Sequence, residues 1–166
     1  IFNKKTSYEI IEEQGSHVVK ADSEKSASAL YHQIDVDLNK TPYLNWRWKI
    51  TNTLKGVDET TKEGDDYPAR LYVVIPGKGF QLTPRSLNYV WASHAKEGSD
   101  WVSAYTKKVH LLALQSGDNK AGQWVVEKRN IKEDLKQYFG ENINQILGIA
   151  IMTDTDNSQQ SAVSYY

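Results

Sequence analysis

The chain has 166 residues, 25% of them charged, and a formal net charge of −1, which predicts one soluble domain spanning residues 1–166. A net charge near zero argues against a nucleic-acid binder, because binding to a phosphate backbone needs a concentrated basic surface. The lack of cysteine excludes disulfides and thiolate metal sites. No apolar run approaches the roughly 20 residues that a membrane-spanning helix needs.

Most segments alternate apolar and polar residues and are rich in Val, Ile, Thr, Tyr and Trp, which is typical of β-strands. Ten strands are predicted, in chain order, at residues 7–12, 17–21, 27–38, 43–53, 69–75, 87–92, 107–115, 123–128, 147–153 and 162–166. Turn residues separate them. The pattern predicts an all-β fold, an antiparallel β-sandwich or jelly roll with one short helix.

The strand at 43–53 carries different residue types on its two faces, because side chains alternate along a strand. Trp46 and Trp48 share the apolar face, which predicts core positions. Arg47 points the other way, so we expect it on an accessible face as a candidate ligand-binding residue. A hairpin with the preceding strand would place Asp35 opposite Arg47.

An acidic, threonine-rich segment at 57–66 has no periodicity and predicts an exposed loop that leads into the next strand. In an extended chain Asp66, Arg70 and Tyr72 share one face, with Asp65 beside them. A guanidinium next to a carboxylate and a phenol can bind sugar hydroxyls or a sugar carboxylate. The alternative is a salt bridge that attaches the loop to the sandwich.

Aromatic residues recur on the strand at 87–92, where Tyr89 and Trp91 share a face. Aromatic rings give a large contact area to a sugar at a low entropic cost. Trp91 lies at the strand end, next to Ser93 and His94, which makes it a candidate ligand-binding residue together with Tyr89. The alternative is that both rings belong to the core.

One helix is predicted after residue 130. Asn130 can cap its start, Glu133 occupies the capping-box position, and Gly140 can end it in the left-handed conformation. An apolar stripe, which predicts packing against the sandwich, is formed by Ile131, Leu135, Tyr138 and Phe139.

The segment after the strand at 147–153 brings Asp154, Asp156 and Asn157 close together in sequence. Carboxylate and amide oxygens suit Ca²⁺, so these three residues are candidate metal ligands. The spacing is not that of an EF-hand. The alternative, which the frequency of Asp and Asn in turns favours, is a turn capped by side chains.

The order of these motifs resembles the family called domain of unknown function 3047, whose members are exported proteins of bacteria. The resemblance rests on Phe2, Thr6, Tyr8, residues 26–30, Pro42 with residues 44–49, Asp65, Asp66, Arg70, Tyr72, residues 89–91, Arg129, Asp134, Phe139, Gly140 and residues 152–157. It implies a periplasmic or secreted location but no established activity. A chain that starts at Ile1 fits removal of an N-terminal segment, and the resemblance implies a chain that continues a little past Tyr166.

Three functions follow as hypotheses. The first is non-catalytic binding of a carbohydrate or related envelope polymer by a monomer, through residues gathered on one sheet face or rim. The second is a polysaccharide hydrolase or lyase with a pair of carboxylates among Asp65, Asp66, Asp154 and Asp156. The third is a protein-interaction module of the bacterial envelope. The absence of recognisable catalytic motifs favours the first.

Overall fold

The computed structural model describes residues 4–80 and 83–166, so Ile1 and Phe2 lie outside the described residues. The described residues form eleven strands and one helix. They are β1 (Ser7–Glu13), β2 (Ser16–Glu24), β3 (Ala29–Asp37), β4 (Tyr43–Ile50), β5 (Tyr67–Ile75), β6 (Arg85–Ala92), β7 (Asp100–Val102), β8 (Val109–Ser116), β9 (Val125–Asn130), α1 (Ile131–Phe139), β10 (Gln145–Asp154) and β11 (Ser161–Tyr165). No helix in the described part is long and apolar enough to cross a membrane.

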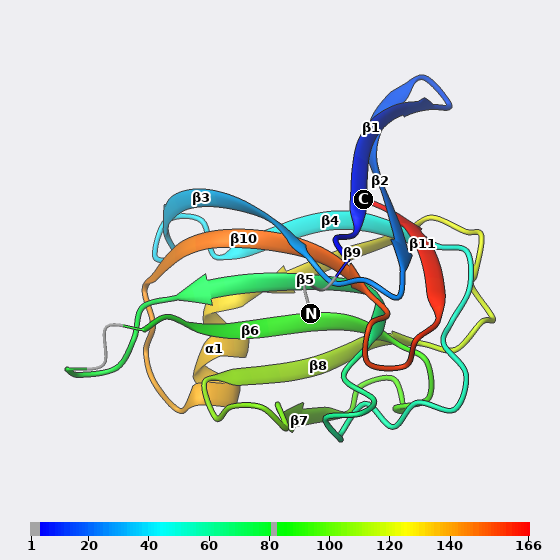
Figure 1. Cartoon of the computed structure of the whole chain (residues 1–166). Helices are drawn as coiled ribbons and strands as arrows, with labels where there is room; N and C mark the ends of the chain where they lie inside the picture. Colours follow the sequence, from blue (N-terminus) through cyan, green and yellow to red (C-terminus); the bar gives the residue numbers. More distant parts are fainter. Residues whose placement is uncertain (1–3, 81–82) are drawn as a thin grey trace.

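The strands form two sheets that pack face to face, as Figure 1 shows. One has five strands in the order β1-β2-β11-β4-β9, and the other has six in the order β3-β10-β5-β6-β8-β7. The β-sandwich and all ten predicted strands are therefore confirmed. The named strands pair antiparallel, as predicted, except that β6 and β8 run parallel, which makes the six-stranded sheet mixed. β7 was not predicted, since three residues are too few to show a period of two.

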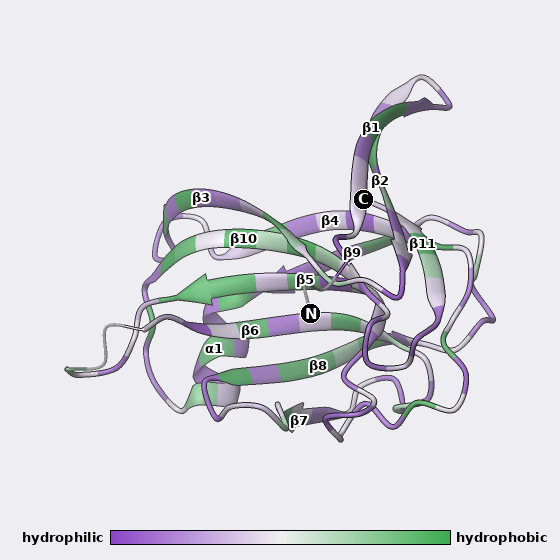
Figure 2. Ribbon diagram, viewed as in Figure 1, coloured by the Kyte–Doolittle hydropathy of each residue, from purple (hydrophilic) through white to green (hydrophobic). Residues whose placement is uncertain are grey.

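Large apolar side chains from both sheets meet between the layers. Trp48 from β4 and Trp91 from β6 are both fully buried, with ring centroids 6.1 Å apart. Trp46 is partly buried and packs 5.2 Å from the Tyr89 ring. Figure 2 marks in green the hydrophobic residues along β10, β5, β6 and β8 of the six-stranded sheet. The predicted core positions of the two β4 tryptophans are confirmed.

Helix α1 begins and ends as predicted. The Asn130 side chain accepts a hydrogen bond from the Glu133 backbone N–H (3.2 Å), and Gly140 adopts the left-handed conformation at φ 68°. Ile131 and Leu135 are buried against the sandwich. The capping residues and the apolar stripe thus place one short helix beside β9 and β4.

The strands before and after the turn at 38–42 do not form a hairpin. β3 pairs with β10 in one sheet, whereas β4 pairs with β9 and β11 in the other, and Arg47 lies opposite Val126. Asp35 accepts a hydrogen bond from Gln145 (2.7 Å). The predicted pairing of Asp35 with Arg47 is wrong, because the turn carries the chain from one layer to the other.

Candidate functional site

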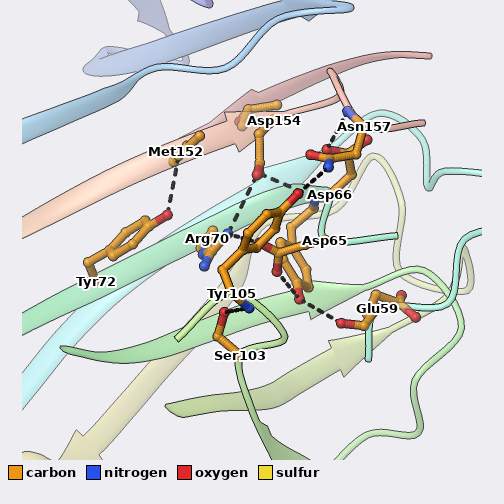
Figure 3. A network of polar contacts seen from close by, with 12 residues as sticks. Glu59, Asp65, Asp66, Arg70, Tyr72, Ser103, Tyr105, Met152, Asp154 and Asn157 are labelled. Carbon is orange, nitrogen blue, oxygen red and sulfur yellow. Dashed lines mark hydrogen bonds and ion pairs between the residues drawn. The ribbon is translucent and has the colours of Figure 1, made fainter. Parts of the chain in front are cut away.

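Arg70 lies on β5 at the centre of a polar network beneath the loop at 57–66 (Figure 3). Its side chain is 7% exposed and its guanidinium lies between two aromatic rings, 4.9 Å from the centroid of Tyr67 and 4.7 Å from that of Tyr72. Residues that are two positions apart in a strand point to the same face, which explains why Arg70 and Tyr72 lie together, as predicted. Rings on both sides hold the guanidinium in one orientation.

Two carboxylates and one amide surround the guanidinium. Arg70 Nη1 lies 3.7 Å from Asp65 Oδ2 and 3.5 Å from Asp154 Oδ2, which are ion-pair distances. The Asn88 amide, turned so that both its atoms find partners, accepts hydrogen bonds from Arg70 Nη2 (2.9 Å) and Nε (3.1 Å). The charge of Arg70 is therefore satisfied inside the protein, by residues of β5, β6, β10 and the loop.

Asp66 bonds to the turn after β10. It is fully buried, and its carboxylate accepts hydrogen bonds from the backbone N–H groups of Asn157 (3.2 Å) and Ser158 (2.5 Å). The chain turns at residues 156–159, so the turn predicted after β10 is confirmed, with Asp66 capping it from across the fold. Asp66 thereby joins the end of the 57–66 loop to the C-terminal end of β10.

The predicted calcium ligands point to different partners. Asp154 pairs with Arg70 and accepts the Tyr67 backbone N–H (3.3 Å), while the Asn157 amide donates to the carbonyl of Lys62 (2.7 Å). Within residues 4–80 and 83–166, no three His, Cys, Asp or Glu side chains are grouped to hold a metal ion. The hypothesis of a calcium site gains no support from this arrangement.

Burial changes the acidity of this network. Desolvation raises the pKa of Asp154 well above its ordinary value of 3.8, although the Arg70 charge opposes the shift. Burial likewise raises the pKa of Asp65, again against the effect of Arg70, and raises that of Asp156. Because one guanidinium is shared by two buried carboxylates, Asp65 and Asp154, negative charge remains unbalanced, and the folded state favours protonation of a carboxylate.

This shift predicts a pH dependence of stability. The folded state holds the Asp154 proton more tightly than the unfolded state, so the stabilisation from this group is present at low pH and is lost as the pH rises through the folded-state pKa. In Asp154→Asn this loss is absent, and the stability of the variant relative to wild type should increase as the pH rises above about 4. Urea unfolding at a series of pH values measures the trend.

Asp58→Asn is a matched control, because the pKa of Asp58 is shifted in the opposite direction. Asp58 is exposed, and hydrogen bonds from Thr60 lower its pKa. A lowered folded-state pKa contributes stability above the ordinary pKa, so Asp58→Asn should become less stable relative to wild type as the pH rises. Parallel trends in the two variants would contradict the assignment of the shift to Asp154.

Two predicted ligand-binding aromatics are inaccessible. Tyr89 and Trp91 are fully buried, so the expectation that their rings form an open platform is wrong. The Tyr89 hydroxyl donates to Asp134 (2.6 Å), which Arg129 also binds through two nitrogens (2.7 and 2.8 Å). Trp91 donates through Nε1 to the Gly117 carbonyl (3.1 Å). Tyr89 and Trp91 lie opposite Leu71 and Ala69 of β5, which are core residues, so both rings point into the core.

The motifs that carry the family resemblance meet in these buried networks. Arg129 and Asp134 hold α1 to Tyr89, and Thr6 donates to the Thr153 carbonyl (2.8 Å). The chain matches the family model described as "Protein of unknown function (DUF3047)" over residues 1–166. It belongs to this family. No curated protein matches the DUF3047 chain.

An accessible site lies on the outer side of the five-stranded sheet of this DUF3047 protein. We call it the basic aromatic face, and it consists of Tyr43, Arg47, Lys49, Trp124, Val126, Lys128 and Tyr165. The Arg47 guanidinium lies 4.4 Å from the Trp124 ring centroid, and Lys128 Nζ lies 4.9 Å from that of Tyr43. Arg47 and Lys128 are exposed on adjacent strands, β4 and β9.

The cations of this face are unequally paired. Lys49 forms an ion pair with Glu13, whereas in the described part of the chain neither Arg47 nor Lys128 has an acidic partner within 4 Å. Of the residues predicted to bind ligand, Arg47 is the most accessible. Trp124 and Lys128 were not identified as site residues from the sequence. Alternation along residues 123–128 predicts that they share a face, but only the pairing of β9 with β4 shows that this face lies beside Arg47.

Proposed function

We propose that this chain is a non-catalytic domain that binds an acidic carbohydrate, or a related anionic polymer of the bacterial envelope, through the basic aromatic face. The observation that carries the proposal is the pair of exposed cations, Arg47 and Lys128, that rest on aromatic rings and lack acidic partners in the described chain. The proposal places the protein where such polymers lie, in the periplasm or outside the cell.

The stacking of Arg47 on Trp124 supports recognition of an anion. The Arg47 guanidinium lies over the Trp124 ring and is exposed, so its N–H groups can donate two parallel hydrogen bonds to a carboxylate, sulfate or phosphate. The ring also restricts the side chain before the ligand arrives, which lowers the entropic cost of binding. Exposed parts of Tyr43 and Val126 add apolar contact area beside the cations.

The hydrolase or lyase hypothesis receives less support. Asp65, Asp66 and Asp154 are 9%, 0% and 3% exposed, and each is already bonded to Arg70, Tyr67 or the backbone of the turn at 156–159. A general acid or base must reach the substrate within hydrogen-bond distance. Carboxylates enclosed in this way are better suited to holding the loop to the sandwich.

The test compares single variants of Arg47 and Lys128. Arg47→Ala and Lys128→Ala should each weaken binding to a polyuronate about tenfold, since a hydrogen bond to a charged group contributes about 1.5 kcal/mol or more. Added salt should weaken wild-type binding as well. Isothermal titration, after a broad glycan array has selected the polymer, measures both effects.

The control is Lys107→Ala, which removes the same charge from an exposed position between β7 and β8 in the other sheet. Its affinity should equal that of wild type. Binding to no acidic glycan on the array would overturn the proposal, and so would equal losses in the control and in Arg47→Ala. Equal affinity for neutral and acidic glycans would contradict the role given to the cations.

A further inference from the structure

The hairpin of β1 and β2 extends the five-stranded sheet at one edge. In Figure 1 it rises above the sandwich and bends over at its tip. β2 pairs with β11 from Glu24 to Lys20, and Val19 then exchanges backbone hydrogen bonds with Tyr166 (3.0 and 2.9 Å). Before Val19, the described residues of β2 pair only with β1. In the described chain, the tip of the hairpin therefore has no backbone hydrogen bond to the rest of the sheet.

One side of the hairpin continues the side of the sheet that carries the basic aromatic face. Four residues are successive partners across β1, β2, β11 and β4, namely Glu9, Lys20, Tyr165 and Lys49. Side chains of directly opposite residues lie on the same side of a sheet. Lys20 Nζ lies 3.3 Å from Glu9 Oε1, and Lys49 Nζ lies 4.4 Å from the Tyr165 ring centroid. Because side chains alternate along a strand, Glu13 shares this side with Glu9.

Glu13 is the last residue of β1, and its side chain reaches over the sheet to Lys49. The two side chains form an ion pair and are 26% and 13% exposed. Only one carboxylate oxygen is used, because Glu13 Oε2 is buried and has no hydrogen-bond partner among the described residues. An enclosed oxygen without a partner offsets part of what an ion pair contributes. The contact is therefore one in which another carboxylate can replace that of Glu13.

Lys49 belongs to the same site as Arg47 and Lys128. Its Nζ lies 5.0 Å from the Trp124 ring centroid, and the Arg47 guanidinium lies 4.4 Å from the same centroid. Two positions along a strand correspond to a step of about 7 Å on one face, which is the step from Arg47 to Lys49. Lys128 lies opposite Asn45, one such step before Arg47. The three cations therefore form a row along β4.

We propose that Glu13 occupies a third anion site of the basic aromatic face, at Lys49, and that a carboxylate of the bound polymer displaces it there. This inference rests on the proposed function, since it concerns the same site and ligand. The displaced hairpin tip moves away from Lys49, and the polymer contacts three cations in a row. Such local opening occurs where a fold has few attachments, as at this tip. Glu13 thereby selects for ligands with closely spaced negative charges.

Glu13→Gln tests the proposal, because it removes the competing charge and keeps Lys49. The variant should bind polygalacturonate about fivefold more tightly than wild type, since a partly exposed ion pair no longer has to be broken. In the Lys49→Ala background the same substitution should leave the affinity unchanged, which separates a contact at Lys49 from a general loss of negative charge. Isothermal titration measures the dissociation constants, and circular dichroism confirms that each variant is folded.

Glu12→Gln is the matched control. Glu12 is exposed, precedes Glu13 on β1 and points to the other side of the strand, so its loss should not change the affinity. Equal gains in the Glu12 and Glu13 variants would overturn the inference, and so would a gain that persists without Lys49. Binding by wild type that Glu13→Gln does not tighten would overturn the inference and leave the proposed function standing. Absence of binding in both would overturn the two together.

Discussion

Replacing Arg70 by alanine is expected to lower the free energy of unfolding by about 3–5 kcal/mol. The guanidinium is enclosed by Tyr67, Tyr72, Asp65 and Asp154, all at least half-buried. Its removal leaves two buried carboxylates without their cation, which costs more than the pair contributes when it is intact. Urea denaturation monitored by tryptophan fluorescence measures the difference.

Two further variants test this explanation. Arg47→Ala removes the same side chain from an exposed position and should change stability by less than about 0.5 kcal/mol. Asp154→Asn in the Arg70→Ala background should recover part of the loss, because it removes one of the unpaired charges. A loss below about 1 kcal/mol in Arg70→Ala would show that the network contributes little to holding the loop.

Replacing Trp91 by alanine is expected to cost about 3–5 kcal/mol, the range found when a buried aromatic side chain is truncated. Trp91 is fully buried, packs against Trp48, and satisfies its N–H through the Gly117 carbonyl. The variant loses packing and leaves that carbonyl without its partner. Thermal and urea unfolding of the purified chain measure the loss.

Trp124→Ala is the matched control, because it removes a tryptophan from the surface. Trp124 is half-buried beneath Arg47 and Lys49, so its loss should change stability much less than that of Trp91. It should instead weaken polyuronate binding, since Arg47 loses the ring that orients it. The reverse pattern, with Trp91 needed for binding and Trp124 for stability, would contradict the division between core and binding face.

The strands and the helix were predictable because their signals are local. Alternation in β4 and β5, the Asn130 cap and the Gly140 stop depend on neighbouring residues alone. The contact between Arg70 and Tyr72 followed from the same rule. The three-residue strand β7 and the parallel pairing of β8 with β6 were not predictable, because neither leaves a periodic pattern in the chain.

The candidate site was only partly predictable. Sequence alternation placed Arg47 on the side of β4 opposite the tryptophans, but it did not show that Trp124 and Lys128 stand beside it. Nor did it show that Tyr89 and Trp91 face the core or that Asn88 completes the surroundings of Arg70. These facts depend on which strands pair and in which register, and that information is not carried by any single segment.

The sequence by itself determined the class of fold, the positions of most elements and the two-sided character of β4, since side-chain alternation and capping act within a few residues. The tertiary structure decided which polar residues are enclosed and which are accessible. Arg70 and its carboxylates are enclosed because β5, β10 and the 57–66 loop close over them, while Arg47 lies on the outer side of β4 and is exposed. Burial is a property of the assembled sheets, so only the assembled sheets could show which of these two arginines is enclosed and which is accessible.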